Sequence, residues 1–194
     1  YPNNVGGDNN PNYVALQFIP ATADTSVISA YQASFNAILA EANDTNANPG
    51  DNVADATPSA DPTAQDYSNI GADIGAAAND AQNLALLNDI IGASQQADVN
   101  TVAEINELAR IANAIQLKAA GGTPNPALTA DDFAKIGIAG VTADNLAAVQ
   151  QAIAAKLDDG SQTDSLSELQ AAIDAAVAAY QASLDAITAY AVND

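Results

Sequence analysis

The sequence predicts an all-α protein, made of tandem three-helix modules with an additional N-terminal helix and an extended N-terminal arm. Three observations lead to this fold class. The apolar residues are mostly alanine, the strongest helix former, while the chain has only three Phe and no Trp or Met. Apolar residues recur in steps of three and four, the period of an amphipathic helix. Finally, the words PTAQDYSNIG, from Pro62, and LTADDFAKIG, from Leu128, indicate that one segment occurs twice.

The arm is expected over residues 1–23. Its first part is rich in Asn, Gly and Pro, and the following word YVALQFIP is the one convincing strand pattern, which ends at a proline. A single strand must satisfy its backbone hydrogen bonds elsewhere, either against its own helices as a strap or on a neighbouring subunit as an assembly arm. The residues assigned to this contact are Tyr13, Val14, Leu16, Phe18 and Ile19.

A helix is expected over residues 24–43, capped by Asp24 or Thr25. Its word AYQASFNAI returns as AYQASLDAI near the C-terminus, so this helix resembles the last helix of a repeat. The last helix opens at a capping box on Ser165 and continues to about Val192, long enough to project from its module and pack along another helix, most simply along residues 24–43. The residues assigned to assembly on these two helices are Tyr31, Phe35, Tyr180, Leu184 and Ile187.

Residues 44–62 have no periodicity and are predicted to be an acidic linker loop. Within it, side chains with oxygen atoms alternate and a glycine follows, which is the pattern that a calcium loop requires. The candidate calcium ligands are Asp44, Asn46, Asn48 and Asp51. Against this interpretation, Pro49 stands where a calcium loop has glycine and Asp55 where it has glutamate, so a solvated linker remains the alternative.

The repeated segments predict helical module A over residues 63–120 and helical module B over 129–194, separated by a Gly/Pro linker over 121–128. In module A we expect a first helix over 63–78 that is interrupted near Gly71 or Gly75, a second over 80–92, and a third that Thr101 caps. In module B, Thr129 and Thr142 should cap the first two helices. Tyr67 and Phe133 occupy equivalent positions and are expected in the core.

The charge and composition exclude several classes of function. The chain has 4 Lys and Arg against 24 Asp and Glu, a formal net charge of −20, which would repel nucleic acid and anionic lipid. No apolar run is long enough for a membrane span. There is no His and no Cys, so the usual general base and thiol nucleophile are lacking. Asp131 and Asp132 fit helix-start charges better than a catalytic pair, and the four cations fit solvated helix ends, so we predict a protein that is not an enzyme.

The string LTADDFAKIGIAGVTADNLAAVQQAI, followed by SLSELQAAIDAAV, resembles the helical repeats of large bacterial surface adhesins and biofilm-associated proteins, and is similar to three-helix surface-protein modules of the albumin-binding type. The resemblance covers residues 129–177 and, less closely, 63–115. It implies an extracellular, cell-surface protein and carries over no ligand-binding residues. We therefore expect a repeat unit or subunit of a surface filament or giant adhesin, which associates with identical copies through the arm and terminal helices. The alternative is a helical binding module for a host or matrix protein.

Overall fold

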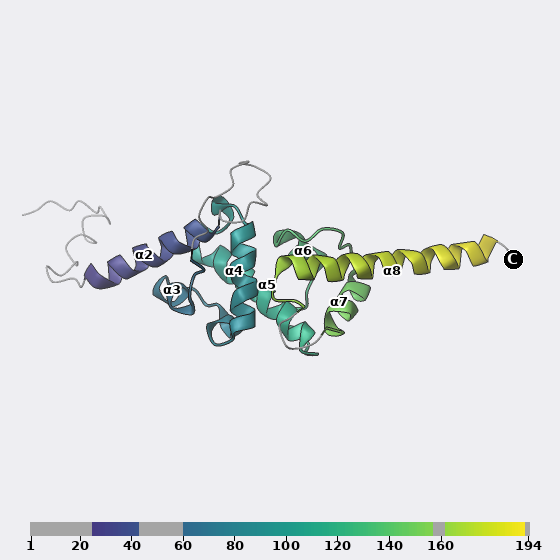
Figure 1. Cartoon of the computed structure of the whole chain (residues 1–194), viewed down its shortest axis with the longest axis horizontal. Helices are drawn as coiled ribbons and strands as arrows, with labels where there is room; N and C mark the ends of the chain where they lie inside the picture. The colour runs from purple at the N-terminus through teal and green to yellow at the C-terminus, as the bar shows by residue number, and fades with distance from the viewer. Residues whose placement is uncertain (1–24, 43–59, 157–161, 193–194) are drawn as a thin grey trace, which may run out of the picture.

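The computed structural model describes residues 25–42, 60–156 and 162–192. These residues form seven α-helices and two short 3₁₀ helices, with no strand among them, which confirms the predicted all-α class (Figure 1). The arm residues Tyr13 to Ile19 and the candidate calcium ligands Asp44 to Asp51 lie outside the described residues. The helices are α2 (Thr25–Glu41), α3 (Ala64–Asn69), η1 (Gly75–Ala78), α4 (Ala81–Ala93), η2 (Gln96–Asp98), α5 (Val102–Ala119), α6 (Ala130–Lys135), α7 (Leu146–Ala154) and α8 (Leu166–Val192).

The threonines predicted to open helices α3, α5 and α6 do so through the same capping box. Each threonine hydroxyl accepts a hydrogen bond from the backbone N–H three residues later, and the acidic side chain at that position accepts one from the threonine N–H. Two of the N–H groups that every helix start leaves without a partner are thereby satisfied. The pairs are Thr63 with Asp66, Thr101 with Glu104, and Thr129 with Asp132.

The short helices α3 and α6 also end in the same way. A glycine follows each helix in the left-handed region, with φ of 76° at Gly71 and 79° at Gly137. The next N–H then reaches back to the carbonyl of a buried aromatic residue, at 2.9 Å in both places. This Schellman-type turn needs glycine because other residues lack easy access to positive φ. The predicted break near Gly71 is thus confirmed, and it divides the expected first helix of 63–78 into α3 and η1.

A single core runs through the molecule from Ile38 in α2 to Ile173 in α8. Tyr67 and Phe133 are its largest fully buried side chains, as predicted from their equivalent positions. Helix α5 lies at the centre, because it packs against η1 and α4 on one side and against α7 on the other. Buried alanines on α5 let these neighbours approach closely, which suits a chain with few large side chains.

Helix α7 starts later than the sequence indicates. Thr142 was expected to cap it, but the helix begins at Leu146 with Asn145 as its N-cap residue. The Asn145 side chain is buried, accepts a hydrogen bond from the Thr142 N–H at 2.8 Å, and donates one to the Gly140 carbonyl at 2.9 Å. These bonds stabilise a turn over residues 143–145, which a cap at Thr142 would have placed in the helix.

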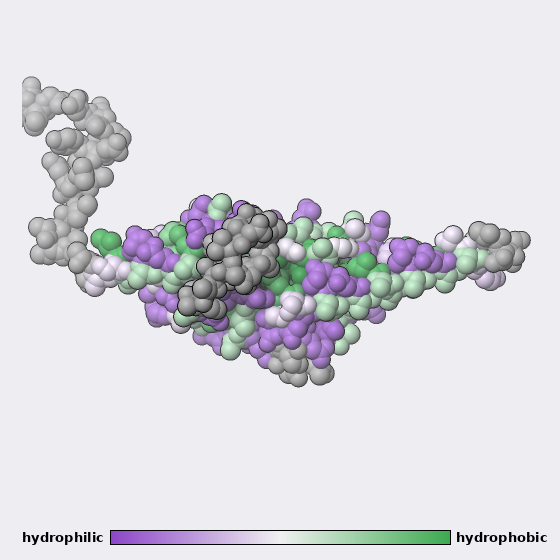
Figure 2. Space-filling model, turned by 45° about the horizontal axis from the view of Figure 1, so that its top comes forward, coloured by the Kyte–Doolittle hydropathy of each residue, from purple (hydrophilic) through white to green (hydrophobic). Residues whose placement is uncertain are grey.

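The two terminal helices leave opposite ends of the molecule. Helix α2 packs against α3 and α4, whereas α8 packs mainly against α7, so the middle of the protein separates them (Figure 1). Figure 2 shows both as narrow rods that extend beyond the thicker centre. The expected length of the last helix is confirmed, since α8 has 27 residues. The expectation that it packs along residues 24–43 is wrong within one chain.

Candidate functional site

The exposed part of α2 carries an apolar surface at one end of the molecule. Val27 and Ile28 are 65% and 64% exposed, and Tyr31 is 41% exposed. The Tyr31 ring stacks on Phe35, with ring centroids 6.0 Å apart and an interplanar angle of 17°. Phe35 in turn packs against the core, so the aromatic pair connects the exposed surface to the folded body. Stacked pairs of this kind have a fixed shape, as a contact surface requires.

The second half of α8 carries a similar surface at the other end. Leu184, Ile187 and Tyr190 are 40%, 66% and 73% exposed, and every described side chain from Gln181 to Ala191 is exposed. Tyr180, one helical turn earlier, is half-buried. Tyr190 was not among the residues predicted from the sequence, although Tyr190 continues the face of Leu184 and Ile187 at steps of three. Apolar side chains gathered in this way mark interaction surfaces more often than isolated ones do.

The inner face of α2 shows how such a helix is held in place. Ile38 and Ala42 are fully buried there. The Ser34 hydroxyl donates to Asp66 of α3 at 2.8 Å and accepts a hydrogen bond from the Asn69 amide at 3.0 Å. The hydrogen bond from the Thr63 side chain lowers the pKa of Asp66, against the effect of burial, and the bond from Ser34 adds to the lowering. Asp66 is therefore an ionised acceptor at neutral pH, which strengthens the hydrogen bonds that it accepts from Thr63 and Ser34.

A cluster of charges connects α5 to α6. Arg110 donates to Glu107 on its own helix at 2.8 Å and to Asp132 on α6, while Lys135 of α6 donates to Glu107 at 2.7 Å. Hydrogen bonds from Arg110 and then Lys135 lower the pKa of Glu107 to about 2. Burial alone would raise the pKa of Asp132, but hydrogen bonds from Thr129 and Arg110 outweigh it and the pKa falls. The cluster therefore links α6 to the central helix α5.

This cluster corrects the sequence-based interpretation of the cations. Arg110 and Lys135 were expected to be solvated helix ends, yet both are engaged with acidic partners. Sequence contained only half of the signal: Glu107 and Arg110 stand three apart on one helix, a spacing that predicts an ion pair. Nothing local indicates that Asp132 and Lys135, on another helix, complete the group.

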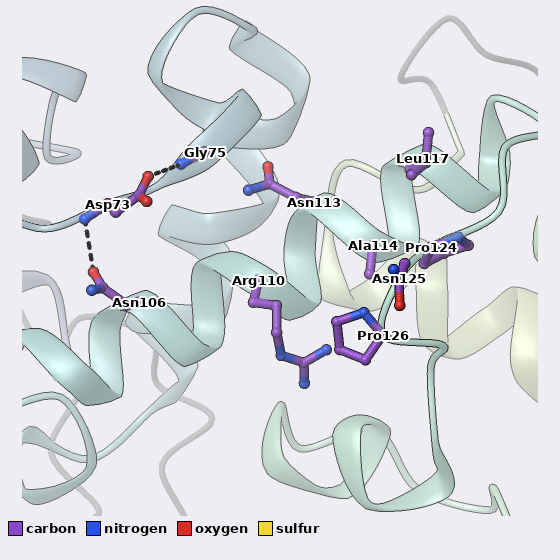
Figure 3. A pocket seen from close by; sticks show the side chains of 10 residues that line it. All are labelled: Asp73, Gly75, Asn106, Arg110, Asn113, Ala114, Leu117, Pro124, Asn125 and Pro126. Atoms are coloured by element: carbon purple, nitrogen blue, oxygen red, sulfur yellow. Dashed lines mark hydrogen bonds between the residues drawn. The ribbon is translucent and has the colours of Figure 1, made fainter.

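A groove beside η1 is lined by apolar residues, among them Leu117 and Pro126, and by polar side chains that make hydrogen bonds within the fold (Figure 3). Asn106 accepts from the Asp73 N–H at 2.8 Å, and Asp73 accepts from the Gly75 N–H at 3.1 Å. Asn113 donates to the Ile74 carbonyl at 2.8 Å and accepts from the Ala77 N–H. These side chains fix the irregular loop around η1 onto α5. Within the described ranges there is no group of three His, Cys, Asp or Glu side chains placed to hold a metal ion.

Between residues 25 and 192, no described helix is long and apolar enough to cross a membrane. Comparison of the chain with protein-family models, with curated proteins and with solved structures finds no match.

Proposed function

We propose that this chain is a structural protein rather than an enzyme: a repeat unit or subunit of an extracellular bacterial surface filament or giant adhesin. Its helices are arranged as tandem three-helix modules, and it associates with identical copies through its terminal helices and its N-terminal arm. The extracellular location rests on the resemblance of residues 129–177 to adhesin repeats.

The modular arrangement is supported by bonds that recur at equivalent positions. α3 and α6 share their capping boxes and glycine turns. In both places, a side-chain amide on the next α-helix also donates a hydrogen bond to the carbonyl of the residue before the N-cap threonine. The Asn88 amide donates to the Pro62 carbonyl at 2.9 Å, and the Gln150 amide donates to the Leu128 carbonyl at 2.9 Å. The segments that contain α3 and α6 share an N-terminal capping box, a C-terminal glycine turn and a hydrogen bond from the next α-helix, which supports their being two copies of one structural repeat.

The observation that carries the proposal is the placement of exposed apolar surface on two helices that leave opposite ends. When a surface at one end of a protein binds a surface at the other end of the next copy, the copies associate head to tail, and such contacts build open filaments unless the rotation between copies closes a ring. The carboxylates support a non-enzymatic role, since Asp132 is engaged in a helix cap and an ion pair.

The test is the assembly state of the purified full-length chain. Light scattering should give masses that exceed the 19.5 kDa of one chain and rise with concentration, and electron micrographs should show elongated particles. Because each copy carries a net charge of −20, added salt should favour assembly by screening repulsion. A monodisperse monomer at every concentration and salt level would refute the proposal. Deletion of residues 1–20 then separates the contribution of the arm, since assembly that persists unchanged excludes a role for it.

One observation favours a second candidate, a binding module for a host or matrix protein. The Tyr31 and Phe35 stack, with Val27 and Ile28 beside it on the same helix, presents aromatic and aliphatic side chains together. Helices bind protein grooves through anchors at such spacings. A compact monomer that nonetheless loses binding to an extracellular-matrix preparation on Tyr31→Asp substitution would support this candidate instead.

A further inference from the structure

The second half of α8 repeats the sequence of α2, and the repeat extends beyond the shared word. The residues at positions 30–34, 37, 38, 40 and 42 are identical to those at 179–183, 186, 187, 189 and 191. The structure also repeats: the Gln32 amide donates to Asn36 at 3.0 Å, and the Gln181 amide donates to Asp185 at 2.8 Å. Both pairs are exposed, so the two helices present the same outward face.

The inner faces, by contrast, differ in what covers them. On α2 the inner face lies on a surface that we call the α2 seat, formed by α3 around Asp66 and Asn69 and by the adjoining side of α4. There Ile38 is fully buried. Its counterpart on α8, Ile187, is 66% exposed.

The serine on each face shows the same difference. Ser34 uses its hydroxyl to bind Asp66 across the seat, at 2.8 Å. Its counterpart Ser183 is exposed, and its hydroxyl turns back to the Ala179 carbonyl of its own helix, at 2.9 Å. Side chains that hold α2 in place are therefore present on α8, where no element among the described residues packs against them.

We infer that the second half of α8 occupies the α2 seat of a second copy of this chain, in place of that copy's own α2. This inference rests on the proposed filament function and names the contact through which it operates. The residues that enter the seat are Ser183, Leu184, Ile187, Tyr190 and Ala191, in the positions of Ser34, Phe35, Ile38, Glu41 and Ala42.

The geometry makes this contact propagate. The α2 seat lies at one end of the molecule and the exposed half of α8 at the other (Figure 1). One copy can therefore receive a helix at one end and donate a helix at the other. Each added copy leaves one α2 seat and one α8 free at the two ends of the assembly, so this head-to-tail exchange can continue. Because α2 is covalently joined to α3, it competes at a high effective concentration, so the exchange should be slow and should increase with protein concentration.

The absence of cysteine from the chain allows a clean test by thiol cross-linking of full-length variants. An Asn69→Cys variant is mixed with a Ser183→Cys variant, incubated under the conditions of assembly and treated with a short bis-maleimide reagent. The matched control replaces the second partner with Ala182→Cys, one residue away on α8, whose counterpart Ala33 is exposed on α2. Circular dichroism confirms that each variant keeps the helical content of the parent protein.

We expect at least about tenfold more product joining positions 69 and 183 than positions 69 and 182, because docking raises the effective concentration of one thiol pair selectively. Equal yields, or a dominant product that joins 183 to 183, would overturn the inference even if the parent protein forms filaments, and the proposed function would then stand with another contact. Absence of both cross-links and filaments would overturn both.

A second measurement does not depend on the cross-link itself. In the double variant Ser34→Cys with Asn69→Cys, the same reagent pins α2 in its own seat. The treated protein should remain monomeric by light scattering, whereas the untreated double variant should assemble like the parent. Assembly that survives the pinning would refute exchange at the α2 seat.

Discussion

Removal of one hydroxyl group, by Tyr67→Phe, tests how the buried polar atoms near the α2 seat contribute to stability. Tyr67 is fully buried, and its hydroxyl donates to the Asn88 side-chain oxygen at 2.6 Å. Burial raises the pKa of Tyr67, so the hydroxyl keeps its proton and acts as the donor up to strongly alkaline pH.

The size of the effect follows from what Asn88 can do afterwards. Its side chain is buried, and its amide is already committed to the Pro62 carbonyl at 2.9 Å. The amide therefore cannot turn to offer its oxygen elsewhere without losing that bond. A buried acceptor left without a donor costs about 1–3 kcal/mol, so we expect the free energy of unfolding to fall by about that amount.

The assay is urea denaturation followed by circular dichroism at 222 nm. The slope increases with protein size, so for 194 residues it should lie near the upper end of the usual range, about 3 kcal/mol per molar urea. The midpoint should then fall by about 0.3–1 M while the slope stays constant. Tyr31→Phe is the matched control, since it removes the same group from a ring that is 41% exposed, and it should change stability by less than about 0.5 kcal/mol. A Tyr67→Phe protein as stable as the Tyr31→Phe protein would refute the reasoning.

Three further predictions concern the caps, the turns and the charge cluster. Thr101→Ala removes a capping box and should lower the free energy of unfolding by about 1 kcal/mol in the same urea assay; an unchanged midpoint would mean that the cap is not needed. Gly137→Ala should cost about 1–2 kcal/mol from its positive φ alone, since an added Cβ would meet nothing within 4 Å, and a stability gain would contradict this. The folded-state pKa of Glu107, about 2, lies below its ordinary value of 4.5. The contribution of the Glu107 carboxylate to the free energy of unfolding is therefore present above about pH 4.5 and is lost as pH falls toward 2. The stability difference between the parent protein and Glu107→Gln should therefore shrink across that interval, and a difference that stays constant down to pH 2 would argue against the ion pairs.

The elements that the sequence predicted correctly are those whose signals are local. A threonine three residues before an acidic residue caps a helix wherever it stands, and the glycine after α3 or α6 has a backbone requirement that other residues meet poorly. The repeat of PTAQDYSNIG and LTADDFAKIG reinforced both signals. This is why the starts of α3, α5 and α6 and the break near Gly71 were predicted within a residue or two.

The features that the sequence did not predict depend on contacts between distant segments. The start of α7 was placed too early because the buried Asn145 side chain stabilises a turn in preference to another helical turn. The charge cluster could not be predicted without knowing that α6 lies against α5 beside Arg110. Helical periodicity correctly placed Leu184 and Ile187 on one face of α8. It could not show that this face is left uncovered by the described part of the chain, because a period carries no information about which element packs against a helix.

The position of α5 between α4 and α7 has a consequence for how the chain responds to load. The elements on both sides of α5 pack against it, with η1 and α4 on one side and α7 on the other. Neither half of the molecule can therefore unfold without exposing apolar surface of the other half. The two halves should therefore unfold as one cooperative unit, and the amide protons of α5 should exchange with solvent more slowly than those of α2 and the outer part of α8. A force applied through the terminal helices would detach those helices first and would meet its main resistance at α5. A filament of such copies would therefore separate at the contacts between copies before the core of any copy unfolded.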